Sequence, residues 1–167
     1  GVCMRDITAY YWFKQYFSEE EIEKIYDIAK KQPYIKAETF GADDDYRRSK
    51  IKWLSFSEDT EWIYQKLVHA MAEANSEEFG FDWTGATEAI QFTTYDSGDK
   101  GHYDWHMDVT PSHQTRKISA VVLLNDDYEG GKLEIDGKNL DETVGAGNLI
   151  IFPSYMLHKV QEVTKGT

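Results

Sequence analysis

Short apolar runs separated by turns fill the second half of this sequence, and this pattern limits the available folds more than any other feature. From residue 88 onward, β-branched and aromatic residues recur in brief segments between Gly, Asn and Asp. Short strands at regular spacing with turns between them are typical of a sandwich or barrel. We expect strands at residues 88–95, 118–124, 132–135, 148–152 and 158–163.

Two helices are predicted ahead of this β region. Ser18 is followed three residues later by Glu21, a capping-box pattern, and Ile22, Ile25 and Ala29 then recur at helical spacing. A second apolar stripe predicts a helix over residues 60–75. The aromatic segment 7–16 is typical of a strand, and the polar segment 41–45 is typical of a mobile loop. The predicted fold class is mainly β, with N-terminal helices that buttress an antiparallel core.

Size and charge exclude several classes of protein. The chain has 167 residues, which suits one domain, and its 18 Lys and Arg against 30 Asp and Glu give a net charge of −12. This charge argues against a nucleic-acid partner and favours neutral or basic ones. No apolar run is long enough to span a membrane, no signal-peptide pattern is seen, and the single cysteine, Cys3, permits no internal disulfide. We therefore expect a soluble, cytoplasmic protein.

A His-x-Asp pair is the main candidate for chemistry. Alternate residues of a strand point to one face, so His106 and Asp108 are expected to lie side by side. A distant histidine such as His158 would complete the 2-His-1-carboxylate set that holds non-haem Fe(II). With five histidines and 15 aspartates, however, chance gives roughly 0.45 His-x-Asp matches. On spacing alone, an ordinary surface histidine is equally compatible.

Several ordered motifs together resemble a known family, the 2-oxoglutarate- and Fe(II)-dependent oxygenases of the prolyl 4-hydroxylase-like branch (bacterial and phage type). The motifs are residues 91–95 followed by Gly98, Tyr103, His106 and Asp108, then residues 130–134, 145–152 and 158–160, with 48–54 upstream. The resemblance implies a double-stranded β-helix (jelly-roll) core. It also implies a single domain over residues 1–167, with helix and strand support over about 1–87 and a catalytic β core over about 88–167 that lacks its C-terminal strand.

The same resemblance assigns roles to individual residues. It implies that His106, Asp108 and His158 hold Fe(II), to which 2-oxoglutarate and then O2 bind. It further implies that Tyr95, Tyr103, Gln91 and Leu123 contact the cosubstrate, and Gln91 and Tyr95 share a strand face. Ordinary packing remains the alternative for Tyr95, Tyr103 and Leu123.

The sequence departs from the family at one position and leaves one patch unassigned. The family places an Arg or Lys nine or ten residues after the second histidine, which here falls at Thr167 or beyond it. We expect this cosubstrate anchor to follow residue 167, and a chain without an anchor is the alternative. Lys165 is expected in a turn, with its side chain in solvent. Arg47, Arg48, Lys50 and Lys52 form a basic patch that we expect to be a solvated strand face.

The resemblance implies a hydroxylase that couples O2-driven decarboxylation of 2-oxoglutarate to hydroxylation of a substrate C–H bond, with ascorbate as a candidate reductant. The branch of the family favours a prolyl residue in a peptide or protein, over which segment 43–52 could fold. The same chemistry on a free amino acid or small metabolite is one alternative. A non-catalytic metal-binding jelly-roll is the other.

Overall fold

The structure is a computed structural model that describes residues 10–36, 46–83, 88–108 and 116–167. The strands are β1 (Tyr11–Phe13), β2 (Ile35–Lys36), β3 (Arg47–Arg48), β4 (Lys50–Leu54), β5 (Ile90–Thr94), β6 (His102–His106), β7 (Ile118–Val122), β8 (Glu129–Gly130), β9 (Leu133–Ile135), β10 (Lys138–Asn139), β11 (Leu149–Pro153), β12 (His158–Val160) and β13 (Val163–Lys165). The α-helices are α1 (Glu19–Lys30) and α2 (Glu61–Ala74). A π-helical turn (Asn75–Phe79) and the 3₁₀ turns Ser97–Asp99 and Asp141–Thr143 complete the elements.

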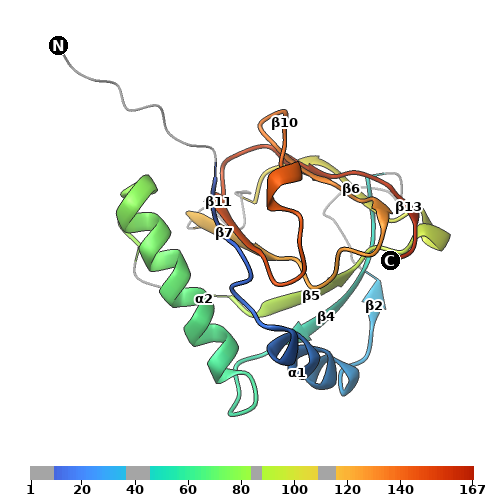
Figure 1. Cartoon of the computed structure of the whole chain (residues 1–167), viewed down its shortest axis with the longest axis horizontal. Helices are drawn as coiled ribbons and strands as arrows, with labels where there is room; N and C mark the ends of the chain where they lie inside the picture. Colours follow the sequence, from blue (N-terminus) through green and yellow to red (C-terminus); the bar gives the residue numbers. More distant parts are fainter. Residues whose placement is uncertain (1–9, 37–45, 84–87, 109–115) are drawn as a thin grey trace.

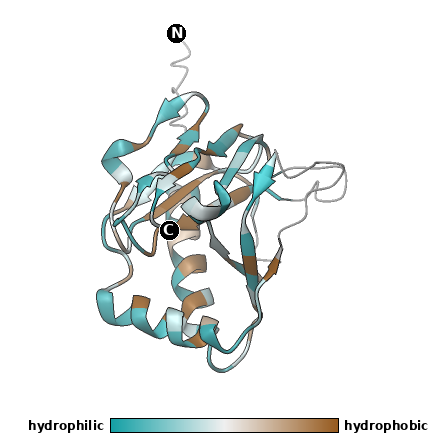
Figure 2. Ribbon diagram, turned by 90° about the vertical axis from the view of Figure 1, so that its right-hand side faces the viewer, coloured by the Kyte–Doolittle hydropathy of each residue, from teal (hydrophilic) through white to brown (hydrophobic). Residues whose placement is uncertain are grey.

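Both helices begin where their sequence signals lie. Ser18 caps α1 with both bonds of the capping box: its Oγ accepts from the Glu21 amide, and the Glu21 carboxylate accepts from the Ser18 amide. Thr60 precedes α2. Glu21 also pairs with Lys66 of α2 at 3.0 Å, which ties the two helices together. Both helices lie on one flank of the strands (Figure 1), and both carry hydrophobic residues between hydrophilic ones (Figure 2).

The strands form antiparallel sheets that match the predicted β core. A three-stranded sheet has the order β1-β11-β7, and a five-stranded sheet has the order β10-β9-β12-β6-β3. A second three-stranded sheet, β2-β4-β5, and a two-stranded sheet, β13-β8, complete the strands. Strand β12 therefore lies between β9 and β6, which places His158 opposite His106.

Strand β11 is the centre of the fold because it is buried on both faces. Its alternation sends Leu149 and Ile151 toward α2, and Ile150 and Phe152 into the space between the sheets. All four side chains are fully buried. A strand covered on both faces reads as a continuous apolar run, as residues 149–152 do.

The observed strands differ from the prediction in their lengths. Of the aromatic segment near the N-terminus, the structure describes residues 10–16, and among these three form β1, because Lys14 and Gln15 form a turn in which Gln15 has a φ of 48°. The strand expected over 158–163 is two strands, β12 and β13, which pair with different partners. The turn expected at Lys165 is wrong: this residue ends β13, although its side chain is exposed as expected. The loop expected at 41–45 lies outside the described residues.

Within the described part of the chain, no helix combines the length and the apolar character that crossing a bilayer requires.

Candidate metal centre

Three residues that are predicted from the sequence as metal ligands meet in space. His106 ends β6, Asp108 lies two residues later, and His158 begins β12. One ligand atom from each lies within 4.8 Å of the others. The Asp108 Oδ1 atom is 3.4 Å from His158 Nε2 and 3.8 Å from His106 Nε2. The prediction that His106 and Asp108 share one face of a strand is wrong in one detail. Asp108 lies beyond the end of β6, where the chain bends and brings the carboxylate toward the two histidines.

Backbone carbonyls fix the orientation of both imidazoles. His106 Nδ1 lies 2.7 Å from the Asp104 carbonyl oxygen, and His158 Nδ1 lies 2.9 Å from that of Met156. Because a carbonyl only accepts, each Nδ1 carries the proton and each Nε2 keeps its lone pair for a metal. This is the usual arrangement of metal-binding histidines.

Hydrogen bonds from neighbouring residues fix the position of the Asp108 carboxylate. Its Oδ2 atom accepts a hydrogen bond from Ser119 Oγ, which lies 2.9 Å from Ser154 Oγ. The Asp108 amide donates to the Ser154 carbonyl, and Arg116 donates to the Asp108 carbonyl at 3.1 Å. Ser119, Ser154 and Arg116 are supporting residues that sequence reasoning missed, since no spacing rule links them to the ligands.

The charges of the site also suit a cation. Burial, helped by the neighbouring His158, lowers the pKa of His106 to about 4, so this ring is neutral at neutral pH. Burial alone would raise the pKa of Asp108, but hydrogen bonding and charge from His158, with the Ser119 bond, lower it overall. A neutral imidazole and an ionised carboxylate are the protonation states that metal binding needs.

Three of the four predicted cosubstrate residues gather around Arg47. Its Nη2 donates to Gln91 Oε1 at 3.0 Å, and its guanidinium lies 4.3 Å from the ring centroid of Tyr103. Burial raises the pKa of Tyr95 to about 12, partly offset by charge and a hydrogen bond from Arg47. We call Arg47, Gln91, Tyr95 and Tyr103 the Arg47 cluster.

The predicted solvated basic face is wrong. Arg47 and Lys52 are both buried, with 9% and 7% of their surface exposed. Strand pairing of β3 with β6 covers Arg47, while Lys52 turns toward α1 and donates to the Ala29 carbonyl.

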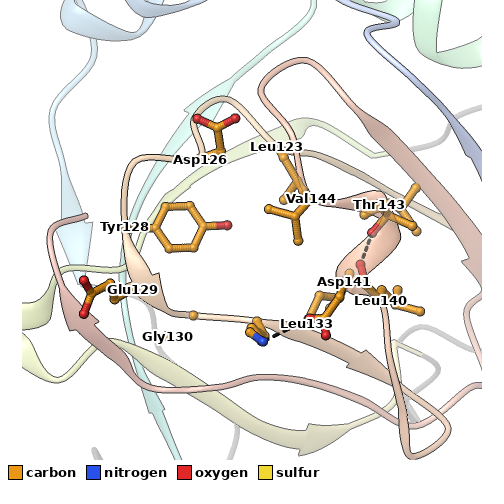
Figure 3. A pocket seen from close by; sticks show the side chains of 13 residues that line it. Leu123, Asp126, Tyr128, Glu129, Gly130, Leu133, Leu140, Asp141, Thr143 and Val144 are labelled. Carbon is orange, nitrogen blue, oxygen red and sulfur yellow. Dashed lines mark hydrogen bonds and ion pairs between the residues drawn. The ribbon is translucent and has the colours of Figure 1, made fainter.

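The fourth predicted cosubstrate residue, Leu123, lies elsewhere and lines a cavity of about 290 Å³. Leu133 and Ile150 also line it, together with Tyr128 and three acidic residues, Asp126, Glu129 and Asp141 (Figure 3). Ile150 shares a face of β11 with Phe152, whose ring meets the His158 ring edge-on at 4.7 Å. The cavity therefore lies two residues along β11 from the metal ligands.

Two imidazoles and one carboxylate that converge inside a jelly-roll define the class of non-haem iron proteins with open coordination positions. Residues 90–167 match the model of the 2OG-Fe(II) oxygenase superfamily. This part of the chain, which carries all three predicted ligands, is therefore similar to that family, and the match covers just under half of the chain. Members of that family are oxygenases that use Fe(II) and 2-oxoglutarate. The chain spans less than half the length of the hydroxylase relatives that it matches.

Relatives and solved structures agree with this placement. A PKHD-type hydroxylase of Teredinibacter turnerae is 38% identical over 86 residues, which are 46% of this chain and 37% of that relative. A Pseudomonas putida prolyl-4-hydroxylase has a TM-score of 0.72 at 19% identity, over 94% of this chain and 86% of that one. A Trichoplax adhaerens prolyl hydroxylase, solved with a hypoxia inducible factor peptide, has a TM-score of 0.73 at 15% identity, over 94% and 79%. These structures establish the double-stranded β-helix fold.

Proposed function

We propose that this chain is an Fe(II)- and 2-oxoglutarate-dependent hydroxylase that acts on a prolyl residue of a peptide or protein. The observation that carries the proposal is the convergence of His106, Asp108 and His158, with both imidazoles oriented by carbonyls. When bound, Fe(II) with 2-oxoglutarate and O2 supplies the oxidising power that replaces a C–H bond by C–OH.

The residues of this chain position the reactants. His106, Asp108 and His158 would hold the metal, a ligand set that is typical of non-haem Fe(II) sites with open positions. Ser119 and Ser154 keep the Asp108 carboxylate aimed at the metal. We propose that 2-oxoglutarate extends from the metal into the cavity that Leu123, Leu133 and Ile150 line on its apolar side; Lys132 also lines this cavity and supplies a cation for the cosubstrate.

The roles of Gln91, Tyr95 and Tyr103 as cosubstrate contacts remain predictions. Tyr103 is the best supported, because its ring stacks on that of the proposed ligand His106 with centroids 3.4 Å apart. The grouping of all three around Arg47 gives them a second candidate role, in binding the primary substrate.

A peptide or protein substrate is the more specific part of the proposal. Its support is the likeness to prolyl hydroxylases, one of them solved with a peptide. Ascorbate is proposed as the reductant that restores Fe(II) after unproductive turnover.

The test is succinate release by the full-length protein with Fe(II), 2-oxoglutarate, ascorbate and a panel of proline-rich peptides, followed by mass spectrometry for addition of one oxygen atom. Asp108→Ala should abolish both signals. Asp99→Ala, an exposed carboxylate in an ion pair with Lys50, is the matched control and should retain them. Succinate release without oxygen addition to any prolyl peptide would contradict the prolyl assignment but keep the oxygenase.

A further inference from the structure

We propose that the Arg47 cluster is a recognition site for a carboxylate of the primary substrate. This inference rests on the proposed function, because it assumes that the three ligands hold a reactive metal. It adds a chemical class to the substrate: the group that is hydroxylated lies next to an acidic side chain or a free carboxyl terminus.

The position of Arg47 separates it from the cavity proposed for 2-oxoglutarate. The five-stranded sheet has the order β10-β9-β12-β6-β3. Leu133 of the cavity is on β9, His158 on β12, His106 on β6 and Arg47 on β3. The two histidine strands therefore lie between the cavity and Arg47, so a substrate that approaches the metal from the β3 side meets this guanidinium first.

The partners of Arg47 are all neutral. Its Nε donates to Ser49 Oγ at 2.8 Å and its Nη2 to Gln91 Oε1 at 3.0 Å, while Tyr103 lies under its plane and Tyr95 hydrogen-bonds it. No ion pair joins Arg47 to a carboxylate among residues 10–36, 46–83, 88–108 and 116–167. Arginine keeps its charge inside proteins, and burying a cation without an anion is costly.

Three other buried or partly buried cations among the described residues are compensated. Arg116 holds the Glu88 carboxylate with both arms of its guanidinium, and Lys66 pairs with Glu21 at 3.0 Å. Lys52 donates to the Ala29 carbonyl at the C-terminal end of α1, where the helix dipole is negative. Within the described residues Arg47 has neither kind of partner, so its charge is available to an anion that comes from outside the chain.

Gln91 occupies the place that a carboxylate would take. Its amide oxygen accepts from Arg47 Nη2 and from Thr93 Oγ1, both at 3.0 Å, and the residue is exposed to solvent, so a ligand can reach it. A carboxylate that displaces this amide would form a charge-assisted, forked hydrogen bond with the guanidinium, which is stronger than the bond it replaces. Tyr95 stays protonated because its pKa is raised to about 12, so its hydroxyl is able to donate a further bond.

The experiment compares two probes that differ by one negative charge, N-acetyl-L-proline and N-acetyl-L-prolinamide. Their dissociation constants are measured by calorimetry on the full-length protein loaded with Mn(II) and 2-oxoglutarate under anaerobic conditions, where no turnover occurs. The acid should bind about tenfold more tightly than the amide, the difference between a charge-assisted and a neutral hydrogen bond.

Two variants remove the preference in different ways. Arg47→Met deletes the charge, and Gln91→Glu supplies an internal carboxylate that neutralises Arg47 without deleting it. Both should reduce the acid-to-amide ratio to below about twofold. Gln91→Glu should fold at least as stably as the unsubstituted protein, so it remains informative even if Arg47→Met unfolds. Lys50→Met, an exposed cation on β4, is the control for net charge and should keep the tenfold ratio.

Three results would overturn the inference. Equal binding of the two probes, or binding of neither, would mean that the unsubstituted protein has no carboxylate site. An unchanged ratio in Gln91→Glu would make Arg47 a purely structural cation. Loss of 2-oxoglutarate affinity in place of probe affinity would assign Arg47 to the cosubstrate. Succinate release without any probe reports on the proposed function separately, so failure of one does not imply failure of the other.

Discussion

The ring of Tyr103 lies flat on the imidazole of His106, with ring centroids 3.4 Å apart and planes 7° apart. The guanidinium of Arg47 covers the same tyrosine at 4.3 Å from its centroid. His106 is therefore held by the Asp104 carbonyl at Nδ1 and by an aromatic face, and both contacts restrict the direction of its Nε2.

Removing the aromatic face should weaken metal binding. Tyr103→Ala frees the His106 ring, and we expect about a tenfold loss of Mn(II) affinity, the lower end of the range for residues that orient a ligand. Tyr103→Phe keeps the ring and should retain metal affinity within about twofold. If the hydroxyl also contacts 2-oxoglutarate, Tyr103→Phe raises the KM for 2-oxoglutarate alone. Equal metal affinity in Tyr103→Ala and the unsubstituted protein would show that the stacking has no role in positioning His106.

Filling the cavity should weaken binding of 2-oxoglutarate and leave the metal affinity unchanged. Leu123→Trp places a large ring in the space of about 290 Å³, and we expect 2-oxoglutarate affinity to fall at least about tenfold because the two compete for one volume. Mn(II) affinity should stay unchanged. Leu157→Trp, at an exposed position, is the matched control and should alter neither value. Normal 2-oxoglutarate binding by Leu123→Trp would place the cosubstrate elsewhere.

The buried His106 should make the metal-free protein less stable in mild acid. The pKa of His106 is about 4 in the folded chain, against 6.5 for an ordinary histidine, because burial and His158 disfavour its charged form. The unfolded chain therefore takes up this proton first, and stability falls as the pH drops from about 6.5 toward 4, by up to roughly 3 kcal/mol.

Urea unfolding of the metal-free protein at pH 7 and pH 5 measures this loss. His106→Gln cannot be protonated and should lose less stability over the interval than the unsubstituted protein does. His69→Gln, at an exposed position of α2, is the matched control and should behave like the unsubstituted protein. An identical pH dependence in His106→Gln would contradict the assignment of the effect to this ring.

Gly147 should tolerate no side chain because of a close backbone approach. Its φ is 88°, and a Cβ at this position would overlap the Phe17 carbonyl oxygen, just before the Ser18 cap of α1. Gly137 has a similar φ of 75°, but a Cβ there would meet no atom within 4 Å, so Gly137→Ala isolates the conformational cost of about 1 kcal/mol. Gly147→Ala should cost at least about 1 kcal/mol more in denaturant unfolding. Equal losses would show that the contact relaxes freely.

Local signals in the sequence predicted much of the fold. The Ser18–Glu21 capping box located the start of α1, and the apolar run of residues 149–152 located β11. Strand limits were less predictable because they depend on pairing: β12 and β13 separate where their partners change from β9 to β8.

The metal site was predictable only in part. The short spacing of His106 and Asp108 gave the pair, and His158 was a candidate third ligand, but only the resemblance to a family raised it above the other histidines, since no local rule joins residues so far apart. The burial of Arg47 could not be predicted, because it depends on pairing of β3 with β6, some 55 residues later in the chain. Four basic residues within six positions predicted a solvated strand face, but two of them, Arg47 and Lys52, are buried.

The most direct test of the central claim is an anaerobic titration of the full-length protein with Fe(II) and 2-oxoglutarate, followed by visible absorption. The account predicts a charge-transfer band that appears only when both are present, because 2-oxoglutarate chelates iron held by His106, Asp108 and His158. Asp108→Ala should lack the band, whereas Asp99→Ala should show it at full strength. Absence of the band in the unsubstituted protein, or its persistence in Asp108→Ala, would contradict the claim that these three residues form an iron site for 2-oxoglutarate.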